Sequence, residues 1–186
     1  MKSVAKKNMV MNNPVLNIDI DEPRWEEVLP DVVNLSEEIL REVVSFVKKY
    51  TENEIVGVRI PLAVNLMLSN DKTVQKLNLE FRGKDSPTNV LSFANIDDPD
   101  FILEPENEEY LELGDIIIAL ETLSKEAEIK KISLKDHFSH LWVHGLLHLL
   151  GYDHIDDADA EEMEYLEVLI LKNLNIRNPY LDIDNA

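Results

Sequence analysis

The spacing of hydrophobic and polar residues predicts alternating strands and helices in the first part of the chain, without an internal repeat. Residues 15–20 alternate apolar with polar side chains, as a half-buried strand does. Apolar positions three and four apart predict a helix whose N-cap is Ser36. Two β-rich runs, 55–60 and 63–68, are separated by Pro61, which is consistent with two strands or with one interrupted edge strand.

The middle of the chain predicts one more helix and two more strands. Asn70 or Asp71 caps a helix with apolar residues at helical spacing. A polar loop separates this helix from a short apolar run at 90–93. Residues 95–112 are acidic and contain two prolines, so they predict an exposed excursion with little regular structure. The unbroken apolar run 116–120 has the length of a strand buried on both faces.

Three helices are expected to complete the chain. The first covers 122–131, the second begins after Ser133 and extends through Leu150, and the third begins after Asp156 or Asp157. Strands mixed with helices and followed by helices predict a layered α/β or α+β fold. The length of 186 residues fits a single domain spanning 1–186.

Composition and charge narrow the possible functions. The chain has no cysteine, so a metal would have to be bound by histidine or carboxylate. No segment approaches the length of an apolar membrane span, and the N-terminus lacks the apolar core of a secretory signal, so we expect a cytoplasmic protein. The formal net charge of −19 opposes simple binding to nucleic acid or to anionic membrane.

The five histidines fall within eighteen residues, and three of them have the spacing of a metal site. His144 and His148 are four residues apart, on one face of a predicted helix. Gly151 is placed to end that helix in a left-handed turn, which would return His154 to the same ion. The pattern HxxxHxxGxxH predicts one divalent ion bound by three imidazoles, with a fourth position open to water. Zinc fits this site, and the spacing alone does not distinguish it from nickel or another borderline ion.

The residue after the first histidine distinguishes between reactions. Metzincin proteases share this ligand spacing but carry a glutamate there, which acts as the general base. This chain has Gly145 instead, so we reject a protease of that mechanism. Hydrolysis of a phosphodiester depends less on a strong protein base than hydrolysis of a peptide does. Much of its catalysis comes from stabilising charge on the phosphoryl oxygens.

Three segments resemble the YbeY family of bacterial endoribonucleases. They are HGLLHLLGYDH at 144–154, LNLEFRGKDSPTNVLSF at 77–93, and LGDIIIA at 113–119. Small departures are Ala94 and Ala119, where many relatives carry proline and cysteine. Neither position is a metal ligand.

The resemblance implies a metal-dependent endoribonuclease specific for single-stranded RNA. It would act in maturation of ribosomal RNA, especially the 3′ end of the small-subunit RNA, and in ribosome quality control. The implied fold is a mixed sheet with helices on both faces, which we take as four- to five-stranded and mostly parallel. By motif position His144, His148 and His154 would be the zinc ligands, and Arg82 would be the catalytic cation that faces the phosphate.

Several residues near these motifs have weaker assignments. Lys84 and Asp85 are candidates for the same region as Arg82, and Asp153 for orienting a ligand. His137 and His140 are expected to be ordinary helix residues or to support the ligands. The lysines that could make the field near the ion positive are Lys84, Lys125, Lys130, Lys131 and Lys135.

The acidic charge leaves alternatives to a simple ribonuclease. We expect weak affinity for free RNA and no binding to DNA. A basic ribosomal protein of the small subunit could bring the acidic protein to its RNA substrate. The same ion could also hydrolyse another small phosphoester or an amide. A third possibility is a non-catalytic module that docks on the ribosome and contains a structural zinc, which would require a fourth protein ligand.

Overall fold

A computed structural model of the chain describes residues 13–103, 105–106 and 108–181. These residues form one four-stranded sheet, six α-helices and two 3-10 turns. In chain order the elements are β1 Val15–Ile20, α1 Arg24–Val28, α2 Val32–Tyr50, η1 Ile55–Gly57, β2 Leu62–Ser69, α3 Asp71–Arg82, β3 Val90–Ala94, η2 Asn95–Asp97, β4 Leu111–Ala119, α4 Leu120–Ile129, α5 Leu134–Leu149 and α6 Asp157–Asn173.

The sheet has the strand order β1-β2-β4-β3. β1 pairs with β2 and β2 with β4 in parallel, whereas β3 is an antiparallel edge strand beside β4. Gly114 of β4 lies opposite Ala94, with φ at 131°, and a Cβ atom there would come within 2.0 Å of the Phe93 carbonyl oxygen. The expected mixed, mostly parallel sheet is confirmed.

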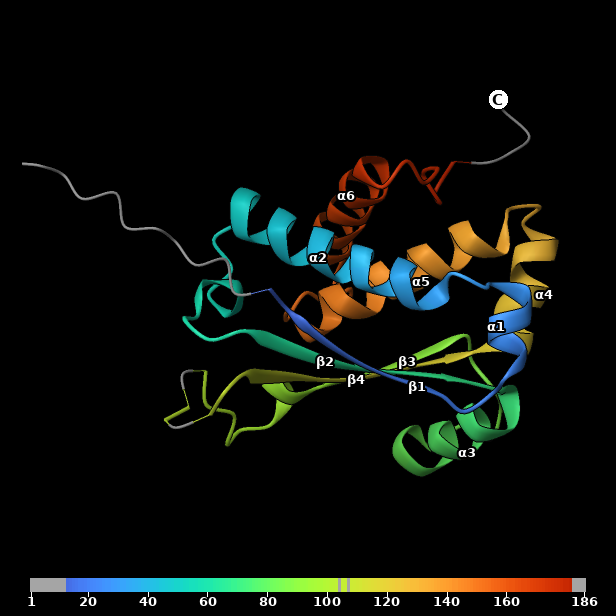
Figure 1. Cartoon of the computed structure of the whole chain (residues 1–186), viewed down its shortest axis with the longest axis horizontal. Helices are drawn as coiled ribbons and strands as arrows, with labels where there is room; N and C mark the ends of the chain where they lie inside the picture. Colours follow the sequence, from blue (N-terminus) through green and yellow to red (C-terminus); the bar gives the residue numbers. More distant parts are fainter. Residues whose placement is uncertain (1–12, 104, 107, 182–186) are drawn as a thin grey trace, which may run out of the picture.

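Helices cover both faces of this sheet (Figure 1). α2, α5 and α6 lie on one face and α3 on the other, while α1 and α4 lie near the ends of the parallel strands. The main core is between the sheet and the helices α2 and α5, where Trp142 and Ile116 are fully buried. The layered α/β arrangement with helices on both faces is therefore confirmed.

The predicted start of the first long helix was wrong. α2 begins at Val32, and Ser36 lies buried within the helix, where its hydroxyl donates a hydrogen bond to the Val32 carbonyl. Val32 and Leu35 are buried, so hydrophobic packing extends the helix by a turn beyond the serine. Upstream of α2, the sequence did not predict the short helix α1, which buries Trp25.

The β-rich run at 55–60 does not form a strand. Residues Ile55–Gly57 form the turn η1, and the sheet continues only at Leu62. The apolar side chains of Ile55 and Val56 are nevertheless buried, so their hydrophobicity reflects packing under α2 instead of strand pairing. The predicted strand at 63–68 is confirmed as β2.

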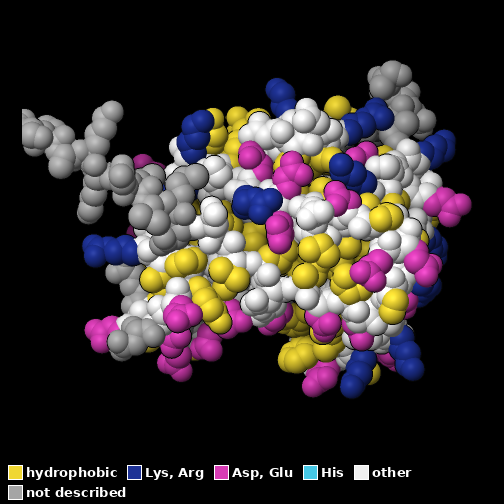
Figure 2. All heavy atoms as spheres, viewed as in Figure 1, with side chains coloured by type: hydrophobic (Ala, Val, Ile, Leu, Met, Phe, Trp, Pro, Cys, Tyr) yellow, Lys and Arg dark blue, Asp and Glu magenta, His cyan; other side chains and the backbone are white. Residues whose placement is uncertain are grey.

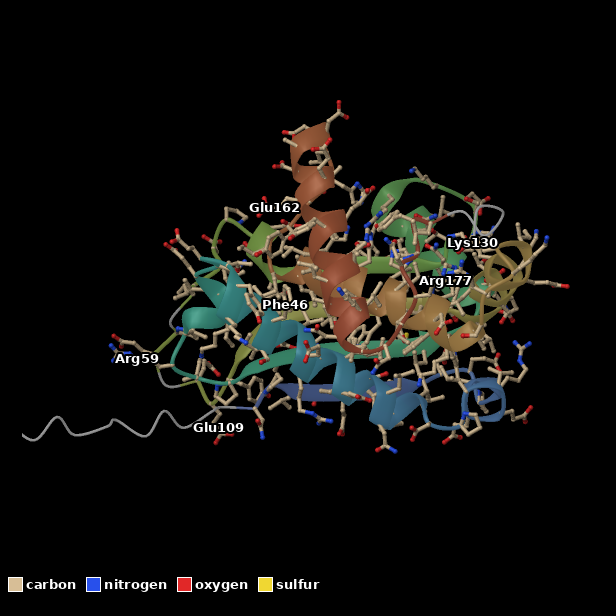
Figure 3. All side chains as sticks on the ribbon, turned by 90° about the horizontal axis from the view of Figure 1, so that it is seen from above. Phe46, Arg59, Glu109, Lys130, Glu162 and Arg177 are labelled. Atoms are coloured by element: carbon tan, nitrogen blue, oxygen red, sulfur yellow. The ribbon has the colours of Figure 1, made fainter. Side chains whose placement is uncertain are left out.

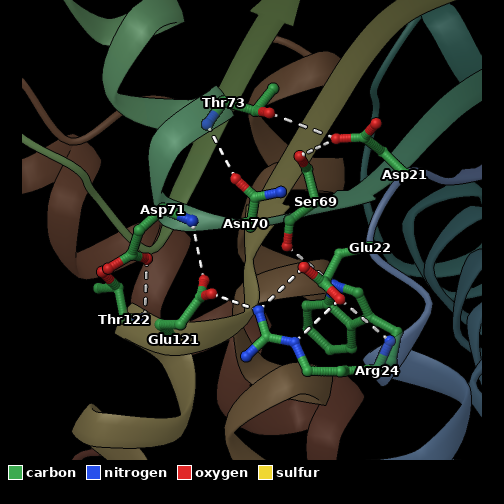
Figure 4. Close-up of polar contacts among 10 residues, drawn as sticks. Asp21, Glu22, Arg24, Ser69, Asn70, Asp71, Thr73, Glu121 and Thr122 are labelled. Atoms are coloured by element: carbon green, nitrogen blue, oxygen red, sulfur yellow. Dashed lines mark hydrogen bonds and ion pairs between the residues drawn. The ribbon is translucent and has the colours of Figure 1, made fainter.

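Two helix starts cap one another where the parallel strands end (Figure 4). The backbone N–H of Asp71, at the start of α3, donates to the Glu121 carboxylate on α4, and the N–H of Thr122 donates to the Asp71 carboxylate. Arg24 pairs with Glu121 and with Glu22. These contacts satisfy donors that each helix would otherwise leave open, and they join α1, α3 and α4 at one corner.

Acidic side chains are spread over the face drawn in Figure 2, and a group of them lies at the edge occupied by the segment between β3 and β4. No histidine is seen on this face. Apart from η2, the described residues of that segment form no helix or strand before β4, as its acidic, proline-containing sequence predicts. Among the described residues, no helix is both long and apolar enough to cross a membrane.

Candidate metal centre

The third histidine is returned to the first two by a glycine turn at the end of α5. Gly151 has φ at 84°, its N–H donates to the His148 carbonyl, and the N–H of Tyr152 donates to the Leu147 carbonyl. This is the Schellman pattern of hydrogen bonds, which reverses the chain and satisfies the last carbonyls of the helix. The predicted left-handed turn at Gly151 is confirmed.

The three histidine rings converge on one point. His144 and His148 have ring centroids 4.6 Å apart, and His154 lies 5.4 Å and 5.0 Å from them. One nitrogen from each ring forms a group whose members all lie within 4.8 Å of one another. The sequence spacing therefore produces the triangular cluster that it predicts.

Glu167 of α6 orients the first histidine. Its carboxylate is fully buried and accepts a hydrogen bond of 2.7 Å from Nδ1 of His144 and one of 2.9 Å from Nε2 of His140. The hydroxyl of Tyr180 donates to the same carboxylate. Burial alone would raise the pKa of Glu167, but these hydrogen bonds and the neighbouring histidines lower it to about 2, so the group is a carboxylate at neutral pH.

The second histidine is oriented by the turn itself. Nδ1 of His148 lies 3.0 Å from the carbonyl oxygen of Tyr152, which can only accept a hydrogen bond. Burial lowers the pKa of His148, and the nearby His144 and His154 lower it further. Both observations favour a neutral imidazole that carries its proton on Nδ1, which is the form of histidine that binds metal through Nε2.

These partners leave two nitrogen lone pairs facing each other. Because Nδ1 of both His144 and His148 donates to an acceptor, neither Nε2 carries a proton in the neutral rings, yet the two Nε2 atoms are 3.1 Å apart. Two lone pairs at this distance repel unless a cation lies between them. Tetrahedral zinc with bonds of about 2.0–2.1 Å would separate its nitrogen ligands by about 3.3 Å. The residues present therefore fit a divalent ion.

The opposite wall of the site comes from β3 and from the end of α3. A pocket of about 380 Å³ is lined by the three histidines together with Arg82, Asn89 and Ser92. Arg82 is the last residue of α3, and its guanidinium lies 3.5 Å from the Ser92 carbonyl oxygen. Strand alternation turns Val90, Ser92 and Ala94 towards the pocket.

Gly145 faces the sheet, and the close contact there explains why the protease glutamate has no place in this fold. A Cβ atom on Gly145 would lie 2.9 Å from Cδ1 of Ile116 and 3.1 Å from Oγ of Ser92. α5 thus approaches β3 and β4 too closely for a large side chain at this position. A glutamate at this position would have to displace the side chains of Ile116 and Ser92.

The weaker sequence assignments have mixed outcomes. Asp153 lines the pocket, but its carboxylate accepts a hydrogen bond from the backbone of His154 and from no histidine ring. Asp85 accepts from Gln75, and neither Asp85 nor Lys84 is among the residues that line the pocket. These two residues are close to Arg82 in sequence without sharing its position.

The two remaining histidines, His140 and His137, are linked to the pocket through hydrogen bonds with glutamates. His140 shares Glu167 with His144, as a residue that supports the ligands does. His137 is fully buried, and burial lowers its pKa, although its Nε2 lies 2.7 Å from Glu126. Glu126 also accepts a hydrogen bond from Asn89, so this pair is joined to the pocket wall.

Sequence reasoning did not identify Glu167, Asn89 or Ser92. Glu167 is one of eight acids between residues 153 and 167. Its one distinguishing signal was its position on the apolar face of the predicted helix, next to Leu166 and three residues before Ile170. Ser92 alternates with apolar residues on a strand, which alone does not separate a pocket residue from a solvent-facing one.

An α/β fold whose pocket combines three converging imidazoles with an arginine is that of a candidate metal-dependent hydrolase. The sequence profile of the family described as Endoribonuclease YbeY matches residues 24–175. The chain is 45% identical to Endoribonuclease YbeY of Paramagnetospirillum magneticum over 88% of this chain and 93% of that protein. It is 42% identical to that of Rhodospirillum rubrum, over 90% and 82% of the two chains.

A solved structure agrees at the level of the fold. The solution structure of TM1509 from Thermotoga maritima superposes with a TM-score of 0.52 at 23% identity, over 92% of this chain and 99% of that one. The sequence matches show the family directly. The chain belongs to the YbeY endoribonuclease family.

Proposed function

We propose that this protein is a zinc-dependent endoribonuclease that cleaves single-stranded RNA during maturation of ribosomal RNA, at the 3′ end of the small-subunit RNA, and in ribosome quality control. Family membership supports cleavage of RNA. The observation that carries the metal dependence is the distance of 3.1 Å between the Nε2 atoms of His144 and His148, whose Nδ1 atoms face acceptors, in the pocket that Arg82 also lines.

The residues of the pocket have distinct proposed roles. His144, His148 and His154 would bind the ion, and Glu167 would hold His144 in the required orientation. A divalent ion would supply positive charge to the phosphoryl oxygens and would activate water. Arg82 would bind a phosphate oxygen through its guanidinium and stabilise the negative charge that develops on the phosphoryl group.

Zinc is the proposed ion because three imidazoles suit it in a tetrahedral site with one open position. The cluster that the described residues form contains three donors and lines an open pocket. A purely structural zinc site would be closed by a fourth protein ligand. The arrangement therefore favours catalysis over a structural zinc in a docking module.

The acidic surface fits recruitment by a partner. With a net charge of −19, long-range electrostatics oppose binding of free RNA, so we expect weak affinity of the isolated protein. A basic ribosomal protein of the small subunit would be attracted by the same charge. Tight binding of RNA by the isolated protein at physiological salt would contradict this part of the proposal.

The function is tested by incubating the purified protein with single-stranded RNA and, separately, with a peptide, each with and without a chelator. We expect cleavage of RNA alone, lost with the chelator and restored by zinc. His148→Ala should reduce the rate at least 100-fold. Cleavage that survives the chelator or the histidine substitution would contradict the mechanism.

The role of Arg82 is tested by Arg82→Ala and Arg82→Lys, with Arg41→Ala as the control. Arg41 is exposed on α2, where its ion pair is with Glu37. Loss of the planar guanidinium should lower kcat 10²- to 10³-fold in the alanine variant, with partial rescue by lysine, because the lysine keeps the charge but not the two-pronged geometry. Arg41→Ala should behave as wild type.

A further inference from the structure

A second pocket, lined by basic side chains, lies beside the metal centre. It has a volume of about 340 Å³ and is bounded by the turn between α4 and α5 and by the segment after α6. Lys130 and Lys131 line it from the turn, and Arg177 lines it from the C-terminal segment. Figure 3 shows Lys130 and Arg177 next to each other at this end of the molecule.

The three cations stand out against an acidic protein. The chain has eighteen Lys and Arg residues against thirty-seven Asp and Glu, yet three of the eighteen line this one pocket. None of the ion pairs formed among the described residues includes Lys130, Lys131 or Arg177. Asp136 also lines the pocket, without being within ion-pair distance of them.

The charge of Lys130 also acts on the buried His137 of α5. Burial is the main cause of the lowered pKa of His137, and the charge of Lys130 lowers that pKa further. Cations around a concave surface that form no ion pair with the other described residues raise the local concentration of anions. An anion in the pocket would be attracted by the positive charges of the three residues.

The basic pocket and the metal centre share a set of contacts. His140 lines the basic pocket, and the carboxylate of Glu167 joins it to His144 of the metal centre. The rings of His140 and His144 are 6.4 Å apart, about one turn of α5. Tyr180 packs against His140 with ring centroids 5.6 Å apart and donates to the same glutamate. The two pockets are therefore lined by histidines one helical turn apart on α5.

We infer that Lys130, Lys131 and Arg177 form a phosphate subsite that binds one backbone phosphate of the RNA strand beside the nucleotide at the metal centre. The inference rests on the proposed function, because it assigns the anion to the RNA substrate. Lysine and arginine are the usual partners of backbone phosphates, and such contacts fix the register of the strand without reading its sequence.

The test compares Lys130→Gln/Arg177→Gln with Lys48→Gln/Lys49→Gln. Both variants remove two positive charges, but the control charges lie in the last turn of α2, near the labelled Phe46 and far from the pocket in Figure 3. Each zinc-loaded protein is titrated against a labelled single-stranded RNA by fluorescence anisotropy over a range of salt concentrations. Melting temperatures of both variants check that they are folded.

The pocket variant should bind the RNA about 5- to 20-fold more weakly, with KM for cleavage raised and kcat nearly unchanged. The slope of the logarithm of affinity against the logarithm of salt should become shallower by about 0.7, the contribution of one phosphate contact on a single strand. An equal loss of affinity in the control variant would overturn the inference, since it would show a general charge effect.

Neutral phosphate analogues distinguish this subsite from other contacts. In a series of RNAs, one backbone phosphate at a time is replaced by a neutral methylphosphonate. Replacing the phosphate that occupies the subsite should weaken binding to the wild type. The same replacement should not weaken binding to Lys130→Gln/Arg177→Gln any further. Additive effects at every position would overturn the inference. If the wild type binds RNA with this coupling but does not cleave it, the subsite stands and the catalytic proposal fails.

The same pocket could attract a free anion instead of RNA. Titration with inorganic phosphate and with a nucleoside monophosphate, followed by competition against the labelled RNA, separates these sources. Millimolar or weaker affinity for the small anions is expected, because RNA has additional contacts at the metal centre. Micromolar binding of either small anion together with unchanged RNA affinity in the pocket variant would contradict an RNA subsite.

Discussion

Glu167 is the residue on which the orientation of His144 depends. It is the buried acceptor for Nδ1 of His144, and its removal would free that ring to rotate or to change tautomer. Glu167→Gln should lower zinc affinity 10- to 100-fold, as measured by competition with a chromophoric chelator. Glu162→Gln, on an exposed part of α6 (Figure 3), is the control and should leave the affinity unchanged.

The same carboxylate predicts a pH dependence of stability. Its pKa of about 2 in the folded protein lies below the ordinary value of 4.5, so its ionised form stabilises the fold above pH 4.5. This contribution, on the order of 2 kcal/mol, should be lost as the pH falls from 4.5 towards 2. Urea unfolding of the metal-free protein should show a steeper loss in the wild type than in Glu167→Gln. Parallel curves would contradict the assignment.

At the scale of elements, the glycine turn at the end of α5 determines the position of His154 in the histidine cluster. Gly151→Ala would place a Cβ atom on a residue with φ at 84°, which should cost about 1 kcal/mol of unfolding free energy. It should also lower zinc affinity, because the reversal positions His154. Gly57→Ala is a suitable control, because a Cβ atom there meets no atom within 4 Å. Equal zinc affinities in the two variants would contradict this role of the turn.

The reciprocal caps of α3 and α4 predict coupled stability. Asp71→Ala leaves the N–H of Thr122 without its partner and should lower the unfolding free energy by about 1 kcal/mol. Glu121→Ala removes the acceptor for the Asp71 N–H and breaks the pair with Arg24. A double-mutant cycle in urea unfolding should give a coupling energy of at least about 0.5 kcal/mol. Strict additivity would show that the two caps act independently.

Local sequence patterns predicted the start of a helix correctly where the capping residue and the first buried residues indicated the same position. Asn70, Ser133 and Asp156 each cap the helix that follows, as their sequence positions indicated. Ser36 had the same local signature but lies inside α2, because burial of Val32 extends the helix. Short apolar runs such as 55–60 remained ambiguous, since hydrophobicity shows that a segment is buried without showing its backbone conformation.

The candidate site was predictable only in part for the same physical reason. The histidine cluster depends on one helix and its terminal turn, so local spacing defines it. Glu167 and Ser92 reach the site through packing of α6 and β3 against α5, and such long-range contacts leave little trace in a single sequence. Arg82 was assigned through the family resemblance, and the structure brings it to the same pocket.

At the scale of the whole molecule, the fold should not require the ion. The core between the sheet, α2 and α5 is built from apolar side chains, whereas His154 is exposed. Chelation should therefore abolish activity while the far-ultraviolet circular dichroism at 25 °C stays native-like. Zinc at 1,000 times its dissociation constant should add about 4 kcal/mol to the unfolding free energy. Global unfolding on chelation would instead indicate a structural metal.

The contact between Glu167 and His144 also has a consequence for biosynthesis. The carboxylate lies 23 residues after the histidine in the chain, on a different helix. A growing polypeptide therefore contains all three imidazoles before it contains the group that orients one of them. We expect tight capture of an ion only after α6 has left the ribosome and docked on α5, which would make assembly of the candidate metal site a late step of folding.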